Sequence, residues 1–257
     1  MTGNGGLQYK HLPLNPLRRE EIVMKKTARP ILLALFFLIG LALFPVAGDG
    51  KDREGRYVVL IDPAHGGRDD GVRLSTGLFE KDLTLTVARL VEKEFEGSRK
   101  VRVRLSRLGD IDVPRSDRVR EAIKSEADLF LSIHVNAGFD RESSGYEVYF
   151  QGFRTSASAK GTRGAPTEIV KDMVRTQHLN ESVRFAKILQ SHLDKVFPRM
   201  DRGLREGPVL VLQGLNIPAV VLEVGFATNS KDRKKLTDEG MQRFLAHALS
   251  ESIKEFF

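Results

Sequence analysis

From residue 56 onward, short runs of β-branched and aliphatic residues alternate with longer segments whose apolar residues recur at helical spacing. Tyr57–Ile61 and Leu129–Val135 are largely apolar and predict strands buried on both faces of a sheet. Glu80–Phe95 instead repeats its apolar residues every three or four positions and predicts a helix. This alternation predicts an α/β fold, with a mainly parallel central sheet of about six strands and helices on both faces.

The other predicted elements follow from the same periodicities. The further strands are expected at Val101–Leu105, Tyr146–Phe150, Val209–Leu212 and Ala219–Leu222. The further helices are expected at Pro114–Lys124, Asn180–Val196 and Met241–Phe256. All of them belong to one domain, residues 49–257.

The segment before this domain is typical of a secretory signal peptide. A basic stretch, Met24–Arg29, precedes the uncharged run Ile31–Phe44 and then Pro45–Gly48. This is the order of a charged, an apolar and a small-residue region. The apolar run has 14 residues, fewer than the roughly 20 that span a bilayer. We therefore expect cleavage after Gly48, with an uncleaved anchor and a buried helix as the alternatives.

Because the signal begins at Met24, residues 1–23 are interpreted as an over-extended start. With residues 24–48 as the signal peptide, the mature protein is expected to be secreted, either periplasmic or associated with the cell wall. Only the signal segment would then contact a membrane.

The distribution of charge argues against a nucleic-acid-binding protein. The formal net charge of the 257 residues is +7. Residues 1–48 carry six Lys and Arg against two Glu, which leaves only +3 for the remainder. No RNA- or DNA-binding motif is present either. The chain has no Cys, so a metal site must use His and carboxylate ligands.

Polar side chains stand where the predicted strands end. His65 follows the first strand, His134 ends the Leu129 strand, and Glu223 follows the Ala219 strand. The carboxyl ends of parallel strands converge on a binding crevice, and two His with a carboxylate can hold a catalytic zinc. Glu80 opens a helix near the same turn and is a further candidate. The spacing alone does not reveal which carboxylate would bind metal and which would transfer a proton.

Four segments, in this order, resemble the conserved blocks of the zinc-dependent N-acetylmuramoyl-L-alanine amidase family of bacterial cell-wall hydrolases (amidase type 3). They are Ile61–Gly67, Glu80–Leu83, Ser132–Ala137 and Leu222–Asn229. The resemblance implies that one Zn²⁺ per chain is held by His65, Glu80 and His134, and that Glu223 is the catalytic carboxylate. It further implies hydrolysis of the amide between N-acetylmuramic acid and L-alanine in peptidoglycan, for cell-wall remodelling or daughter-cell separation.

Two other functions remain open at this point. Another zinc peptidoglycan hydrolase, such as a carboxypeptidase or deacetylase, would use a similar ligand set on another bond. A non-catalytic wall-binding module would keep the fold without turnover. Neither a cysteine nucleophile nor a GxSxG serine motif is present to support another mechanism.

The remaining polar candidates are given structural interpretations. Asp62 and Asn136 either orient the ligands or are turn residues. His192 and His247 are expected to be ordinary helix residues, His178 has a weak claim to reach the site, and His11 lies in the leader. Gly66 and Gly67 are expected to permit a tight turn at His65.

The connection 153–179 is much longer than usual in an α/β domain. Arg154–Pro166 is rich in small polar residues, and Thr167–His178 has apolar residues at helical spacing. In relatives that this chain resembles, an insert at this place carries a helix that occludes the zinc until an activator protein displaces it. The insert is therefore interpreted either as a regulatory cover, with Glu168 as a candidate metal cap, or as a passive surface excursion.

Overall fold

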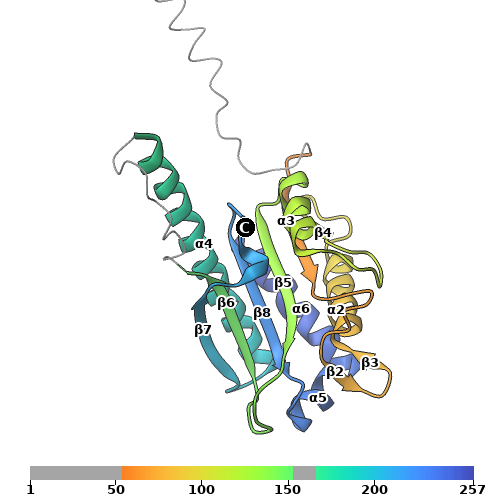
Figure 1. Ribbon diagram of the computed structural model, residues 1–257. Helices are drawn as coiled ribbons and strands as arrows, with labels where there is room; N and C mark the ends of the chain where they lie inside the picture. The colour runs from red at the N-terminus through yellow and green to blue at the C-terminus, as the bar shows by residue number, and fades with distance from the viewer. Residues whose placement is uncertain (1–53, 153–165) are drawn as a thin grey trace, which may run out of the picture. The chain divides into compact units, whose positions relative to one another are not determined.

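The computed structural model describes residues 54–152 and 166–257 (Figure 1). In the second range, side chains are described from residue 170 onward. The predictions for residues 1–23 and 24–48 concern residues outside this range, as do those for His11 and the side chain of Glu168. The described residues belong to one compact unit, Asp49–Phe257. No helix among them is long and apolar enough to cross a membrane.

A six-stranded sheet forms the centre of the domain, in the order β4-β1-β5-β8-β6-β7. Its four parallel strands are β4 (Val101–Leu105), β1 (Tyr57–Pro63), β5 (Leu129–Asn136) and β8 (Ala219–Phe226). β6 (Tyr146–Gln151) runs antiparallel to β8, and β7 (Asp201–Gly207) is parallel to β6. The predicted, mainly parallel sheet of about six strands is confirmed.

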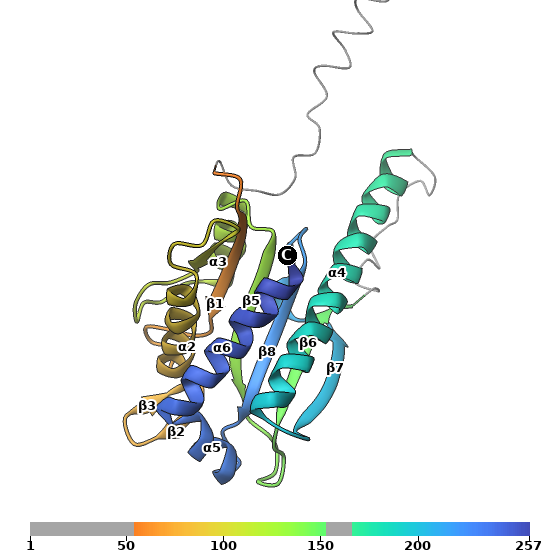
Figure 2. The same cartoon turned by 180° about the vertical axis from the view of Figure 1, so that it is seen from behind.

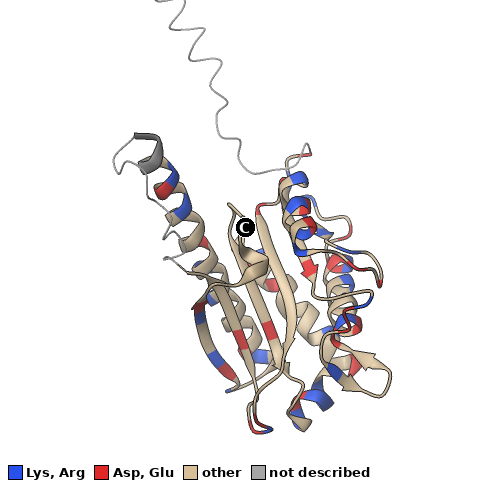
Figure 3. Ribbon diagram, viewed as in Figure 1, with Lys and Arg blue, Asp and Glu red and all other residues tan. Residues whose placement is uncertain are grey.

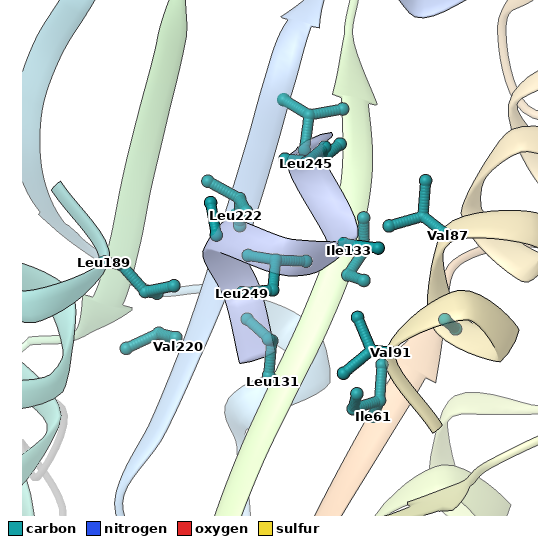
Figure 4. Packing of buried hydrophobic residues seen from close by; sticks show 14 of the residues in the cluster. Ile61, Val87, Val91, Leu131, Ile133, Leu189, Val220, Leu222, Leu245 and Leu249 are labelled. Carbon is teal, nitrogen blue, oxygen red and sulfur yellow. The ribbon is translucent and has the colours of Figure 1, made fainter. Parts of the chain in front are cut away.

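Helices cover both faces of the sheet. α2 (Glu80–Glu94), α4 (Pro166–Val196) and α6 (Glu239–Phe256) pack on one face (Figures 1 and 2), and α3 (Arg115–Lys124) with the short 3-10 helix η1 (Leu210–Leu212) packs on the other. The larger core lies under α2, α4 and α6. There Leu245 and Leu249 meet strand residues such as Ile133 and Leu222 (Figure 4).

Three small elements complete the domain. β2 (Arg73–Ser75) and β3 (Leu78–Phe79) form a two-stranded ribbon between β1 and α2. α5 (Ser230–Leu236) follows β8, and the Asn229 side chain caps its first turn by accepting from the amides of Lys231 and Asp232. The ribbon and α5 were not predicted, because each is too short to show a clear periodicity.

The prediction of a strand at Val209–Leu212 is wrong. Residues 210–212 form η1, and the strand of this region is β7, which lies earlier at Asp201–Gly207. β7 is an edge strand with the sequence DRGLREG, exposed over much of its length. Strand periodicity records burial on one face, so a polar edge strand leaves little pattern.

The second correction concerns the insert. Thr167–His178 does not form a separate tethered helix, because residues 166–196 form one continuous helix, α4. Ser182 donates from its Oγ to the carbonyl of His178 and accepts from the amide of Ala219, the first residue of β8. The first half of α4 therefore lies near the amino-terminal ends of the parallel strands, away from their carboxyl ends (Figures 1 and 2).

Candidate metal centre and its surroundings

His65, Glu80 and His134 come together at the carboxyl edge of the parallel strands. The Oε1 atom of Glu80 lies 3.1 Å from His65 Nε2 and 3.2 Å from His134 Nδ1. One ligand atom from each residue lies within 4.8 Å of the others, and this is the one group able to hold a metal among the described residues. The three residues that sequence reasoning selected as ligands thus form a single cluster.

Glu80 is fixed at the first turn of α2 by backbone donors as well as by the histidines. Its Oε1 accepts from the amide of Val135 and its Oε2 from the amide of Val72. Burial opposes ionisation of this carboxyl, yet the hydrogen bonds from His134 and His65 lower the pKa of Glu80 to about 2. The buried carboxylate therefore stays charged and faces both rings.

His65 stands on a backbone turn of unusual conformation. Its φ is 60°, and Gly66 and Gly67 follow with φ of 128° and 63°. A Cβ on Gly66 would lie 2.4 Å from the carbonyl oxygen of Ile111, and one on Gly71 would lie 2.7 Å from the His65 ring. The predicted role of Gly66 and Gly67 in a tight turn is confirmed.

Two buried arginines hold the carbonyl groups of this turn. Arg107 donates to the carbonyls of Pro63 and Ala64, and Arg118 donates to those of Pro63 and His65. Arg118 in turn pairs with the buried carboxylate of Asp62. Sequence reasoning missed both arginines, because arginine in a loop or on a polar helix is ordinarily exposed.

Asp69 orients the ring of His65 from outside. Its Oδ2 lies 2.8 Å from His65 Nδ1, which leaves Nε2 facing Glu80. Burial favours the neutral ring, but hydrogen bonds and charge from Glu80, and then from Asp69, raise the pKa of His65 to about 9. A carboxylate behind a histidine is a common support for a metal-binding ring. The position of Asp69 four residues after His65 was the sequence feature that could have indicated this contact.

Glu223 lies beside His134. The two residues are direct partners in the register of β5 and β8, so their side chains leave the same face of the sheet. Burial raises the pKa of Glu223 to about 7, and its Oε2 atom is buried without a hydrogen-bond partner among the described residues. A carboxyl with an open acceptor, poised near neutral pH, suits proton transfer.

Beyond Glu223 lies a second carboxylate that sequence reasoning did not select. Glu147 on β6 is the direct register partner of Glu223. Its oxygens accept from Arg202, Tyr149 and Asn136 at 2.8, 2.8 and 3.3 Å. Burial opposes ionisation, but the bonds from Arg202 and Tyr149 lower the pKa of Glu147. Glu147 therefore remains charged next to Glu223.

The other candidates lie outside the cluster. Asp62 is a buried strand residue that bonds Arg118, Ser106 and Ser132, so it supports the His65 turn from below. Asn136 contacts Glu147. His192 and His247 pair with Glu255 and Glu94 on helix surfaces. His178 lines a cavity with Leu212 and Ala219, at the opposite edge of the sheet.

The donor set fits a zinc ion. Two imidazole nitrogens and one carboxylate oxygen converge, and this is the protein part of a zinc site that keeps a position open for water. His65 and Glu80 are also held by partners outside the cluster. An α/β domain with this cluster and an adjacent buried carboxyl has the arrangement of a metal-dependent hydrolase.

Comparison with known proteins identifies the family. The family model for N-acetylmuramoyl-L-alanine amidase matches residues 59–255. The chain is 34% identical over 221 residues to the uncharacterized protein YqiI of Bacillus subtilis, covering 85% of this chain and 93% of that one. It is 28% identical over 227 residues to the N-acetylmuramoyl-L-alanine amidase AmiC of Escherichia coli O6:H1, covering 81% of this chain and 54% of AmiC.

The fold agrees with the same family. The catalytic domain of CwlV, an N-acetylmuramoyl-L-alanine amidase from Bacillus (Paenibacillus) polymyxa, matches with a TM-score of 0.63 and 31% identity, covering 78% of this chain and 97% of that domain. The chain belongs to the N-acetylmuramoyl-L-alanine amidase family. Membership favours an amidase over the carboxypeptidase and deacetylase alternatives. The chain spans about half the length of AmiC.

Proposed function

We propose that this site hydrolyses the amide between N-acetylmuramic acid and L-alanine in peptidoglycan, with one Zn²⁺ held by His65, Glu80 and His134. The observation that carries this is the buried Glu80 carboxylate facing both imidazoles, with the partly unsatisfied Glu223 beside His134. When bound, zinc supplies a Lewis acid that polarises the scissile carbonyl and activates water.

The protein residues account for the proton transfers. Glu223 takes the proton of the attacking water and delivers it to the leaving amine of L-alanine. Asp69 keeps His65 in the orientation that presents Nε2 to the metal. Arg107 and Arg118 fix the backbone below His65 and need no contact with substrate.

Metal dependence gives the direct test. A chelator should abolish the release of new amino termini from purified peptidoglycan, and added Zn²⁺ should restore it. Mass spectrometry of the digest identifies the bond, because amidase products carry a free L-alanine amino group. Release of D-alanine or acetate would point to one of the alternative hydrolases, and full activity in metal-free protein would exclude the zinc assignment.

We further propose that the protein acts outside the cytoplasmic membrane. The support is the order of residues in the 24–48 segment. The substrate itself is a wall polymer, which agrees with a secreted enzyme.

For the insert 153–179, we propose a docking surface for an activator protein rather than a cover. Val170, Met173 and Val174 are exposed on the first half of α4. Since this half lies at the edge of the sheet opposite the metal cluster, an activator bound there would act at a distance from the zinc (Figure 1). Three apolar side chains close together on a polar helix surface are the feature that supports this proposal.

A further inference from the structure

Past Glu223, the sheet offers a polar face that no helix of the described chain covers. α3 and η1 cover the face near β1 and β5, whereas the same face of β6 and β7 is open near the carboxyl end of β8 (Figure 1). Figure 3 shows acidic positions side by side on β8 and β6, and both basic and acidic positions on the neighbouring β7. The site therefore continues sideways across the sheet.

Two arginines on β7 share the single carboxylate of Glu147. Arg202 Nε lies 2.8 Å from Glu147 Oε1, and the nearest nitrogen of Arg205 lies 3.6 Å from the same oxygen. About half of the Arg205 side chain is exposed, and this looser ion pair is its one ionic contact within the described chain. Because the two guanidiniums share one carboxylate oxygen and Arg205 is the more weakly held, Arg205 has donors available for a further anion.

The order of the metal cluster, Glu223 and Glu147 across the sheet indicates which part of the substrate lies near β6 and β7. This inference rests on the proposed function. The group that protonates the leaving amine must lie on the peptide side of the scissile bond, and Glu223 lies between the metal cluster and Glu147. The peptide therefore extends from Glu223 toward β6 and β7, and the sugar lies on the side of β1.

The distances suit a nearby acidic group of that peptide. β7 lies two strand spacings from β8, about 10 Å, and one residue of extended peptide spans about 3.5 Å. An arginine side chain covers part of that gap. A carboxylate on the residue that follows L-alanine comes within its reach.

Charge on the opposite side of the cluster favours the same direction. The loops beside His65 carry four exposed aspartates against Lys81 and Arg68, namely Asp69, Asp70, Asp110 and Asp112. This acidic side repels an anionic peptide, whereas the half-exposed guanidinium of Arg205 attracts it.

We propose that Arg205, with Arg202 and Glu147 as its support, forms a subsite that binds a free carboxylate of the substrate peptide, on the residue next to L-alanine. Arg202 is stacked over the ring of Phe226 at 5.0 Å and bonded to Glu147, so it is the more fixed of the two. Arg205 contacts the substrate and selects peptides whose second residue is acidic over those in which it is amidated.

Binding of two matched peptides to the zinc-loaded protein tests this without requiring turnover. Both are L-Ala–γ-D-Glu–L-Lys with an amidated C-terminus, and they differ only in a free or amidated α-carboxyl on the glutamyl residue. Calorimetry should give about tenfold tighter binding of the free carboxyl, as expected for one charge-assisted contact at a half-exposed site. Equal affinity of the wild-type protein for the two peptides would overturn the proposal.

Variants of Arg205 test whether this residue causes the preference for the peptide with the free carboxyl. Arg205→Gln should remove the preference, and Arg205→Lys should keep part of it because the charge remains. Arg104→Gln is the matched control, since Arg104 is an exposed strand arginine on β4, at the other edge of the sheet. A preference that survives in well-folded Arg205→Gln contradicts the assignment.

Hydrolysis of intact peptidoglycan by the same preparation separates this inference from the proposed function. An enzyme that releases amino termini but binds both peptides equally has the proposed function without the subsite. A protein that prefers the acidic peptide but releases no amino termini has the subsite without the function.

Discussion

At the scale of single residues, the site depends on charges that lie below the substrate-facing surface. Asp62 and Arg118 are both buried, and they form an ion pair under the His65 turn. Removing one member of such a pair leaves an uncompensated charge in the interior, which costs more than the pair contributes. The geometry of the candidate metal ligands therefore relies on residues that lie outside their cluster.

This argument predicts the effect of replacing Asp62. Asp62→Ala should lower the free energy of unfolding by about 3–5 kcal/mol, because Arg118 stays buried without its carboxylate. Asp62→Asn should cost less, since it can keep the hydrogen bond from Ser132. Urea unfolding measures both. Glu251→Ala breaks an exposed pair with Lys254 and should change stability by about 0.5 kcal/mol or less. A similar small loss for Asp62→Ala would refute the anchoring role.

The different roles proposed for Glu80, a metal ligand, and Glu223, a proton acceptor, give a second prediction. Glu223→Gln should retain stoichiometric zinc and lose turnover by about a hundredfold or more, because it removes the proton acceptor but no ligand. His134→Ala should lose both zinc and activity. Metal analysis and amino-terminus release measure the two properties, and His192→Ala, a surface histidine paired with Glu255, serves as control. Loss of zinc from folded Glu223→Gln would mean that Glu223, and not Glu80, is the ligand.

At the scale of elements, sequence patterns located the parts of the molecule that are buried. The strand that precedes His65 and the strands that carry His134 and Glu223 lie inside the sheet and were predicted to within a few residues. β7 was missed because it is polar and at the edge, and Glu147 was missed because its importance comes from its register with Glu223. Contacts across strands depend on tertiary pairing, which a periodicity cannot show.

The first half of α4 is predicted to affect the response to an activator protein and not basal hydrolysis. Replacing residues 153–174 with a short Gly/Ser link should leave basal hydrolysis by purified enzyme unchanged, because the described part of this segment lies away from the metal cluster. Stimulation of activity by a native envelope extract should be lost. Val170→Ser, Met173→Ser and Val174→Ser together should have the same effect, with Ile123→Ser, an exposed apolar change on α3, as control.

The outcomes of that experiment discriminate between three interpretations. A rise in basal hydrolysis would support a cover over the site. Retained stimulation by the extract would refute the docking surface and leave a passive excursion.

At the scale of the whole molecule, the predicted leader decides where the domain works. Protein isolated from its native envelope should begin near Asp49, since cleavage is expected after Gly48. Amino-terminal sequencing measures this directly. Leu35→Arg should block processing by placing a charge in the apolar run. An intact chain recovered from the cytoplasm would contradict the export proposal.

The place of α6 in the core bears on when the domain can fold. This helix follows all the strands in the sequence, and Leu245 and Leu249 pack against strand residues such as Ile133 of β5, which are synthesised much earlier (Figure 4). Ile253 belongs to the same core. Until those residues leave the ribosome, one face of β5 and β8 stays bare, and the sheet lacks the burial that stabilises it. The domain therefore cannot complete its core until α6 has been synthesised, and this agrees with the proposed export of the chain before it folds.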